Sequence, residues 1–310
     1  MLVHKPLSFP VTINWVRKSL YLFLHNRVAQ VAAFVAFVSI VGALFAPLIA
    51  PTDPYDLKSF SILDNFLPPA WTEMGEAKFL IGTDDQGRDL LSSILYGTRL
   101  SLIVGLSAMI FAAILGTSLG LAAGYFGGKF DAVVMRVADV QLSLPAILTA
   151  LLVDGIARGI LPREQHEDLL IVVLTVAIGL SLWVNFARVA RASTFVERNK
   201  EYVQADEIMG LHPLRIMLVS ILPNIMGPLL VIGTVDLAVA VLLESTLSFL
   251  GVGVPPNQPS LGTLIRIGTE YIFSGEWWIV VFPSMTLVIM IVSVNILGDF
   301  IRDVLNPRLR

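Results

Sequence analysis

The sequence contains no cysteine and little charge. Only 15% of its 310 residues are Asp, Glu, Lys or Arg, whereas 55% are hydrophobic. Soluble domains carry about 25% charged residues. The lack of cysteine excludes disulfides, thiolate catalysis and cysteine-based metal sites. The shortage of charge leaves more apolar surface than a soluble chain of this size hides, so it predicts a lipid environment.

Several catalytic and binding signatures are also missing. The histidines His4, His25, His166 and His212 are scattered and lack the spacing of metal ligands. The sequence has no G-x-x-x-x-G-K-[ST] or H-E-x-x-H motif, and no serine lies in a G-x-S-x-G elbow. A formal net charge of −3 gives no basic excess for nucleic acid. We therefore expect no catalytic residue, metal site, Walker-type ATP site or nucleic-acid partner in this chain.

Long apolar stretches predict an all-α integral membrane protein with about six transmembrane helices. Each has the roughly 20 residues that a span requires, and only a helix satisfies its own backbone hydrogen bonds in lipid. The first stretch follows a polar leader and is longer than the core of a signal peptide, so we expect it to be retained. The six stretches lie near residues 28–50, 99–124, 132–153, 169–190, 226–250 and 278–300.

Lys and Arg residues set the predicted orientation. They gather in the N-terminal leader, in the loop between the fourth and fifth stretches, and in the C-terminal tail. Six crossings place these three segments on one side, which the positive-inside rule assigns to the cytoplasm. Both termini are therefore expected in the cytoplasm, with loops 51–98, 154–168 and 251–277 outside.

The first outer loop and the second stretch contain local patterns. Thr83 and Gln86 fit a capping box, and the apolar residues from Leu90 to Leu95 predict a short helix at the membrane surface. Gly116, Gly120 and Gly124 repeat at four-residue spacing, which lets helices approach closely. Packing within this chain is the preferred interpretation, and contact with a partner subunit is the alternative.

Several polar and aromatic residues lie within or beside the spans. Asp236 and Glu244 in the fifth stretch are candidates for the pathway or a subunit interface, although a helix-packing role is also open. Arg136 and Asp139 have the spacing of a structural ion pair. Tryptophans near the span ends are interpreted as interface anchors; these are Trp183, Trp277 and Trp278.

The inner loop between the fourth and fifth stretches is about 35 residues long, and ordered loops of this length are usually functional. Its sequence, ERNKEYVQADEIMGLHPLRIMLVSILPNIMGPLL, predicts two short helices divided near Gly210. Glu201, Ala205 and Ile208 share a face of the first, and Pro223 marks the start of the fifth span. Such a helix either docks in a groove of a partner or lies alone at the membrane surface.

This inner loop resembles the EAA loop of binding-protein-dependent ABC importer permeases. Gln204, Ala205 and Asp206 occupy the E-A-A positions, and Gly210 matches the glycine. The closing pair is Leu222 and Pro223. Asp206 stands where a second alanine is common, and Ser220 stands where histidine is common in the dipeptide and oligopeptide branch.

Four further blocks resemble the same family in the same order. They read GTDDQGRDLLSSILYGTRLSLIVG, GYFGGKFDAVVMRVADVQLSLP, LLESTLSFLGVGVPPNQPSLG and NILGDFIRDVLNPRLR. Together they indicate the C-type subunit of a dipeptide or oligopeptide importer. The resemblance implies a type I ABC importer permease fold. It divides the chain into residues 1–80, holding the leader, first helix and start of the outer loop, and the permease domain at residues 81–310.

The resemblance also implies a set of partners. These are a second homologous permease, two cytoplasmic ATPase subunits that bind ATP and Mg, an extracytoplasmic substrate-binding protein, and membrane lipid of a bacterial or archaeal inner membrane. The chain itself would need no cofactor. The predicted ATPase-docking residues are Glu201, Tyr202, Gln204, Ala205, Asp206, Gly210, Leu222 and Pro223.

Two alternatives stay open at this point. A stand-alone ion-coupled carrier or a membrane-embedded enzyme would use Asp236, Glu244 or Asp139 as a proton site. Within the importer prediction, the substrate would be a di- or oligopeptide or another small solute, such as a metal chelate, a sugar or an opine.

Overall fold

The computed structural model describes residues 21–56, 61–160, 162, 169–255 and 258–305. This part of the chain is helical and contains no strand beyond the isolated bridge between Thr83 and Asp89. The α-helical membrane class predicted from composition is therefore confirmed.

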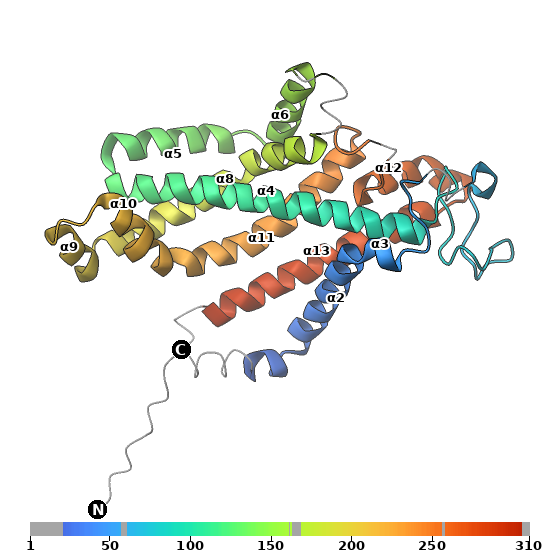
Figure 1. Ribbon diagram of the computed structural model, residues 1–310, viewed down its shortest axis with the longest axis horizontal. Helices are drawn as coiled ribbons and strands as arrows, with labels where there is room; N and C mark the ends of the chain where they lie inside the picture. The colour runs from blue at the N-terminus through green and yellow to red at the C-terminus, as the bar shows by residue number, and fades with distance from the viewer. Residues whose placement is uncertain (1–20, 57–60, 161, 163–168, 256–257, 306–310) are drawn as a thin grey trace, which may run out of the picture.

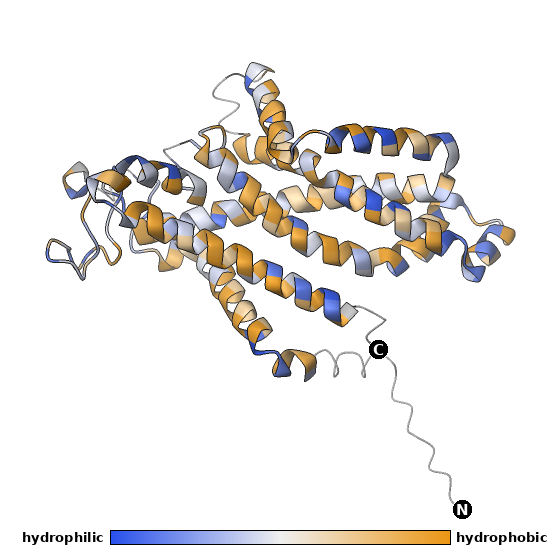
Figure 2. Ribbon diagram, turned by 180° about the vertical axis from the view of Figure 1, so that it is seen from behind, coloured by the Kyte–Doolittle hydropathy of each residue, from blue (hydrophilic) through white to orange (hydrophobic). Residues whose placement is uncertain are grey.

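Five long apolar helices dominate the described residues, each long enough to cross a membrane. They are α2 (Arg27–Leu44), α4 (Leu90–Phe126), α8 (Leu170–Arg198), α11 (Leu222–Phe249) and α13 (Trp278–Leu305). The shorter elements are α3 (Ala46–Ile49), η1 (Ile62–Asp64), α5 (Gly128–Leu142), α6 (Ala146–Ile160), α9 (Glu201–Ile208), α10 (Pro213–Arg215), η2 (Ile216–Ile221), α12 (Leu261–Tyr271) and η3 (Ile272–Ser274). Figure 2 shows apolar residues along the long helices and polar ones at both ends of the molecule and on α5.

The predicted third span is not one straight helix. It consists of α5 and α6, which meet at a bend of 95°. Pro145 lies at the break, where its missing N–H and its ring prevent a continuous helix. The prediction of a single helix at 132–153 was wrong because it relied on the apolar character of the stretch and did not take account of Pro145.

The glycine stripe of α4 packs against α8 within the same chain, as the preferred interpretation held. A Cβ added to Gly116 would lie 2.2 Å from the Trp183 carbonyl oxygen, and one on Gly120 would lie 2.2 Å from that of Ala187. The contact positions rise together along both helices, so α4 and α8 run parallel. Two parallel neighbours require a return crossing between them, and the bent α5–α6 pair supplies it. Counting this pair as one span gives six crossings.

The inner loop between α8 and α11 and the outer loop before α4 lie at opposite ends of the molecule. Figure 1 shows α9 and α10 at one end of the long axis, and α3, α12 and the loop before α4 at the other. Most core side chains lie where α4, α8 and α11 meet, and a second cluster joins α12 and α13 to the start of α4. The two ends are thus connected by continuous helices.

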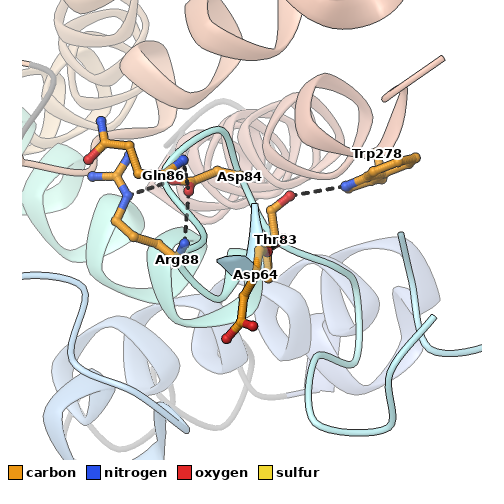
Figure 3. A network of polar contacts seen from close by, with 6 residues as sticks. All are labelled: Asp64, Thr83, Asp84, Gln86, Arg88 and Trp278. Atoms are coloured by element: carbon orange, nitrogen blue, oxygen red, sulfur yellow. Dashed lines mark hydrogen bonds and ion pairs between the residues drawn. The ribbon is translucent and has the colours of Figure 1, made fainter. Parts of the chain in front are cut away.

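The outer loop folds around a buried ion pair (Figure 3). Arg88 Nε donates to Asp84 Oδ2 at 2.6 Å, and the two side chains are 1% and 0% exposed. Asp84 Oδ1 also accepts from the backbone N–H of Gln86 and of Arg88, both at 2.9 Å. Trp278 Nε1 donates to the Thr83 carbonyl oxygen at 3.1 Å, tying the loop to α13. Thr83, Asp84, Arg88 and Asp89 of this loop are therefore buried like residues of a protein interior.

The local helix predictions for this outer loop were wrong. Asp89, and not Thr83, caps α4, since Asp89 Oδ2 accepts from the Ser92 N–H at 2.9 Å. No separate surface helix forms at 90–95, because nothing in this sequence interrupts the helix before Phe126. Thr83 instead binds the loop to itself, donating to the Asp64 carbonyl oxygen at 2.6 Å.

Two further predictions changed in the tertiary structure. Asp139 pairs with Arg188 of α8 at 2.7 Å, not with Arg136 on its own helix. Trp183 and Trp278 are 6% and 7% exposed, so they are packing residues and not interface anchors. Trp277 is 42% exposed and remains available for an anchoring role.

Candidate functional site: the inner docking loop

The chain turns sharply after α9. Gly210 has φ +72°, a left-handed conformation that glycine adopts without strain. Its N–H donates to the Glu207 carbonyl oxygen at 3.0 Å, and that of Leu211 donates to Asp206 at 3.1 Å, which closes the end of the helix. The predicted division at Gly210 is confirmed.

The second half of the loop differs from the prediction. It does not form a separate short helix but runs through α10 and the π-helical η2 directly into α11. Pro223 is the second residue of α11, but the helix continues unbroken from Pro213, so the missing N–H of Pro223 removes one hydrogen bond from the helical ladder. Only residues 209–212, which contain the turn at Gly210, separate α9 from the helix that continues into α11.

The α9 helix stands clear of the helix bundle. Its single buried residue is Val203, which is fully enclosed. Glu201 and Ala205 are exposed, while Ile208 and Met209 at the tip are 87% and 67% exposed. Exposed large apolar side chains at the tip of a polar helix are typical of a surface that a partner covers.

A first polar contact joins α9 to the end of α8. The Tyr202 hydroxyl donates to Glu197 Oε2 at 2.5 Å, and Lys200 Nζ lies 2.6 Å from Glu197 Oε1. Burial, together with this hydrogen bond, raises the pKa of Tyr202 to about 12. The phenol therefore stays protonated at physiological pH and remains a donor.

A second set of contacts joins α9 to η2 and α11. The Ser220 hydroxyl donates to Asp206 Oδ2 at 2.5 Å. Asn224 Nδ2 donates to the Tyr202 hydroxyl at 3.2 Å and to the Ser220 carbonyl oxygen at 2.7 Å. The two residues that depart from the family pattern, Asp206 and Ser220, are thus hydrogen-bonded to each other.

A third contact reaches α4. The Tyr125 hydroxyl donates to Glu207 Oε1 at 3.2 Å, and the Arg198 guanidinium lies 5.4 Å from the centroid of the Tyr125 ring. α9 is therefore hydrogen-bonded to three long helices, α4, α8 and α11.

The two carboxylates of α11 lie inside the chain's own packing. Asp236 is 2% exposed and accepts from Asn185 Nδ2 of α8 at 2.9 Å. Glu244 is fully buried and accepts from Ser101 at 2.5 Å and from Ser248 at 2.9 Å. Hydroxyl and amide donors of this kind stabilise a buried carboxyl group.

Nothing in the described residues suggests a resident metal. No group of three or more His, Asp or Glu side chains there is placed to hold one. The loop combines an exposed helix tip, side-chain hydrogen bonds to the membrane helices and a glycine turn. This arrangement suits a mechanical element better than a reaction centre.

Comparison with known proteins identifies the family. The model of the binding-protein-dependent transport system inner membrane component matches residues 116–310. The chain belongs to this family. A second model, the N-terminal TM domain of oligopeptide transport permease C, matches residues 15–69. The chain is thus a permease subunit of an ABC importer and a multi-pass membrane protein of an inner-membrane transport system, which favours the importer over a stand-alone carrier or embedded enzyme.

Individual relatives agree over most of the chain. The di/tripeptide transport system permease protein DppC of Pseudomonas aeruginosa is 38% identical over 288 residues, covering 93% of this chain and 90% of the relative. Dipeptide transport permeases DppC of Haemophilus influenzae and Escherichia coli are each 35% identical; they cover 94% and 99% of this chain and 94% and 98% of their own lengths.

A solved transporter shares the fold. A structure of the MetNI methionine ABC transporter in an inward-facing conformation aligns with a TM-score of 0.54 and 19% identity. It covers 68% of this chain and 96% of the matched chain. The ABC importer permease fold is therefore confirmed, while the domain boundary near residue 80 stays a prediction.

The sequence missed most residues that support the docking helix. Tyr125 is far from α9 in sequence. Glu197 and Asn224 lie within the quoted loop, but no periodicity marks them. Asp206 and Ser220 did carry a signal, since both depart from the family pattern. When two residues of one loop both depart from the family pattern, contact between their side chains is to be expected.

Proposed function

We propose that this chain is one of two permease subunits of an ATP-driven importer of di- or oligopeptides, and that α9 docks a cytoplasmic ATPase. The peptide class is supported by the names of the relatives that align over nearly the whole chain. The docking role is supported chiefly by the exposed tip of α9, with Ile208 at 87% exposure beside the left-handed Gly210.

The coupling follows from this geometry. Two ATPase subunits, which bind ATP and Mg in place of this chain, close on nucleotide binding and move α9. Contacts of α9 with α4, α8 and α11 pass that motion to the membrane helices. The permease pair then exchanges inward-open and outward-open states, as expected of a two-state element biased by a ligand. The residues assigned to the docking surface are Glu201, Tyr202, Gln204, Ala205, Asp206 and Gly210, with Leu222 and Pro223 at the start of α11.

The second permease would pack on the face between α4 and α11. An apolar groove of about 440 Å³ lies there, lined by residues such as Met109, Phe186 and Met226 and reaching Leu222 of the docking loop. A binding protein would deliver the peptide at the opposite end, on the outer loops. In this arrangement both termini and α9 lie in the cytoplasm of a bacterial or archaeal cell.

The test is a mild-detergent purification of the tagged chain from its native membrane, followed by mass spectrometry and an uptake assay. We expect a second six-span permease and a Walker-type ATPase to copurify, and labelled dipeptide to enter proteoliposomes only with ATP. An Ile208→Asp variant should lose the ATPase but keep the second permease, because it changes only the tip of α9. Recovery of the chain alone, or uptake driven by membrane potential without ATP, would contradict the proposal.

A further inference from the structure

The segment that connects α9 to the body of α11 lacks regular α-helical hydrogen bonding. Residues Ile216–Ile221 form a π-helix, a rare geometry that is frequent at functional sites. Pro223 follows at once, and Pro228 lies inside α11; neither has an N–H for the helical ladder. Gly227 has nothing within 4 Å of its added Cβ. Residues 216–228 therefore have the features of a hinge.

A hinge at this position creates a mechanical problem. If α9 were connected to α11 through the backbone alone, bending within residues 216–228 would absorb the displacement of α9. Two side-chain hydrogen bonds bypass part of this path. Asp206 holds Ser220, near the end of η2, and Tyr202 holds Asn224, in the first turn of α11. The first contact therefore reaches the last turn of η2, and the second reaches beyond η2 into α11.

The geometry points to a polar strut, made of the Asp206–Ser220 and Tyr202–Asn224 hydrogen bonds, that keeps α9 and the start of α11 moving together. Its residues act as positioning residues for transport, and the inference rests on the proposed function. The backbone carbonyl of Asp206 also accepts from the Leu211 N–H at 3.1 Å, so the side chain that binds Ser220 lies directly at the turn that ends α9.

Breaking the strut should uncouple ATP hydrolysis from uptake. In the complete importer complex in proteoliposomes, we expect Ser220→Ala to raise the ATP hydrolysed per labelled dialanine by about fivefold, since a hydrogen bond to a carboxylate is lost. Ser220→Thr keeps the hydroxyl donor and should stay near wild type, whereas Asp206→Ala should match Ser220→Ala. The Ser220→Ala/Asp206→Ala double variant should be no worse than either single variant.

A matched control separates the strut from general damage to the span. Thr246→Ala removes another hydroxyl from α11, whose hydrogen bond goes to its own helix at Leu242. We expect no change in the coupling ratio. A wild-type ratio in Ser220→Ala, or an equal change in Thr246→Ala, would overturn the strut.

The absence of cysteine allows a direct test of whether the strut stays closed. An Asp206→Cys/Ser220→Cys variant is joined by a short thiol cross-linker. Cross-linking should bring the coupling ratio back toward wild type, because the two elements are again held together. Loss of uptake on cross-linking would mean that the contact opens in every cycle and would overturn the inference.

A distance measurement keeps the two proposals separate. Spin labels on Glu201→Cys of α9 and Leu230→Cys of α11 should give one narrow distance in the complex, unchanged by trapping with ATP and vanadate. Ser220→Ala should broaden it, and equal widths in both would refute the strut. If the wild-type complex takes up no dipeptide, the proposed function fails, while the distance still decides the strut.

Discussion

The outer and inner loops contain comparable polar residues but use them in opposite ways. In the outer loop the Asp84–Arg88 pair is almost fully buried, and Trp278 donates a hydrogen bond to the neighbouring Thr83 carbonyl oxygen. In the inner loop the contacts of Asp206 and Tyr202 are partly exposed, and Ile208 is 87% exposed. Burial gives the outer loop a fixed shape. Exposure leaves the inner loop a surface that another protein is able to cover.

The largest effect is expected from breaking the outer loop. Arg88→Ala leaves the buried Asp84 carboxylate without its ion-pair partner, which should lower the free energy of unfolding by about 3–5 kcal/mol. Thermal unfolding in detergent measures this loss. Lys78→Ala is the control, because its pair with Asp64 spans 3.4 Å at 58% exposure of the lysine and should contribute at most about 1 kcal/mol. Equal melting temperatures for both variants would show that the buried ion pair stabilises the outer loop no more than an exposed one does.

A second variant tests the helix contact that connects the two ends. Gly120→Ala places a Cβ 2.2 Å from the Ala187 carbonyl oxygen and should destabilise the protein by about 1–3 kcal/mol. Gly155→Ala, in α6, meets nothing within 4 Å and should be neutral or stabilising by up to about 1 kcal/mol. Thermal unfolding of the pair distinguishes them. Equal stability would show that α4 and α8 are less closely packed.

The inner loop should respond in function more than in stability. Gly210→Val forces a β-branched residue into a left-handed conformation, at a cost of about 1–2 kcal/mol. We expect the variant to insert normally while ATP-dependent uptake falls and hydrolysis continues. Gly210→Asn should retain much of the uptake, because asparagine tolerates this conformation. Wild-type uptake in Gly210→Val would contradict the docking role.

The smallest effect is expected at the enclosed carboxylate of α11. Asp236→Asn preserves shape and keeps an oxygen for Asn185, so uptake should fall by less than about twofold. The measurement is ATP-dependent uptake at matched amounts of assembled complex. Loss of uptake with assembly intact would assign Asp236 to the pathway and not to helix packing. The same assay on Glu244→Gln would extend the test to the serine-bound carboxyl group.

Prediction from sequence succeeded where the signal was a long apolar stretch, a regular residue spacing or a single turn residue. Apolar stretches gave the membrane class, the spacing of Gly116, Gly120 and Gly124 indicated close helix packing, and Gly210 marked the turn of the docking loop. It failed where one residue competed with a pattern. Pro145 broke a stretch that was apolar enough to span, and Asp89 capped α4 although Thr83 matched the capping motif.

The sequence by itself determined that this protein is a helical membrane protein, because a long apolar stretch in lipid has to satisfy its backbone hydrogen bonds internally. The length and motif of the inner loop were also evident from the sequence alone. Only the tertiary structure decided which polar groups meet. Asp139 forms its ion pair with Arg188 of α8 and not with Arg136. Trp278 packs in the core and donates to the Thr83 carbonyl oxygen, and Asp206 accepts from Ser220. Such contacts depend on how helices distant in sequence are packed, and that packing is set by the whole chain together.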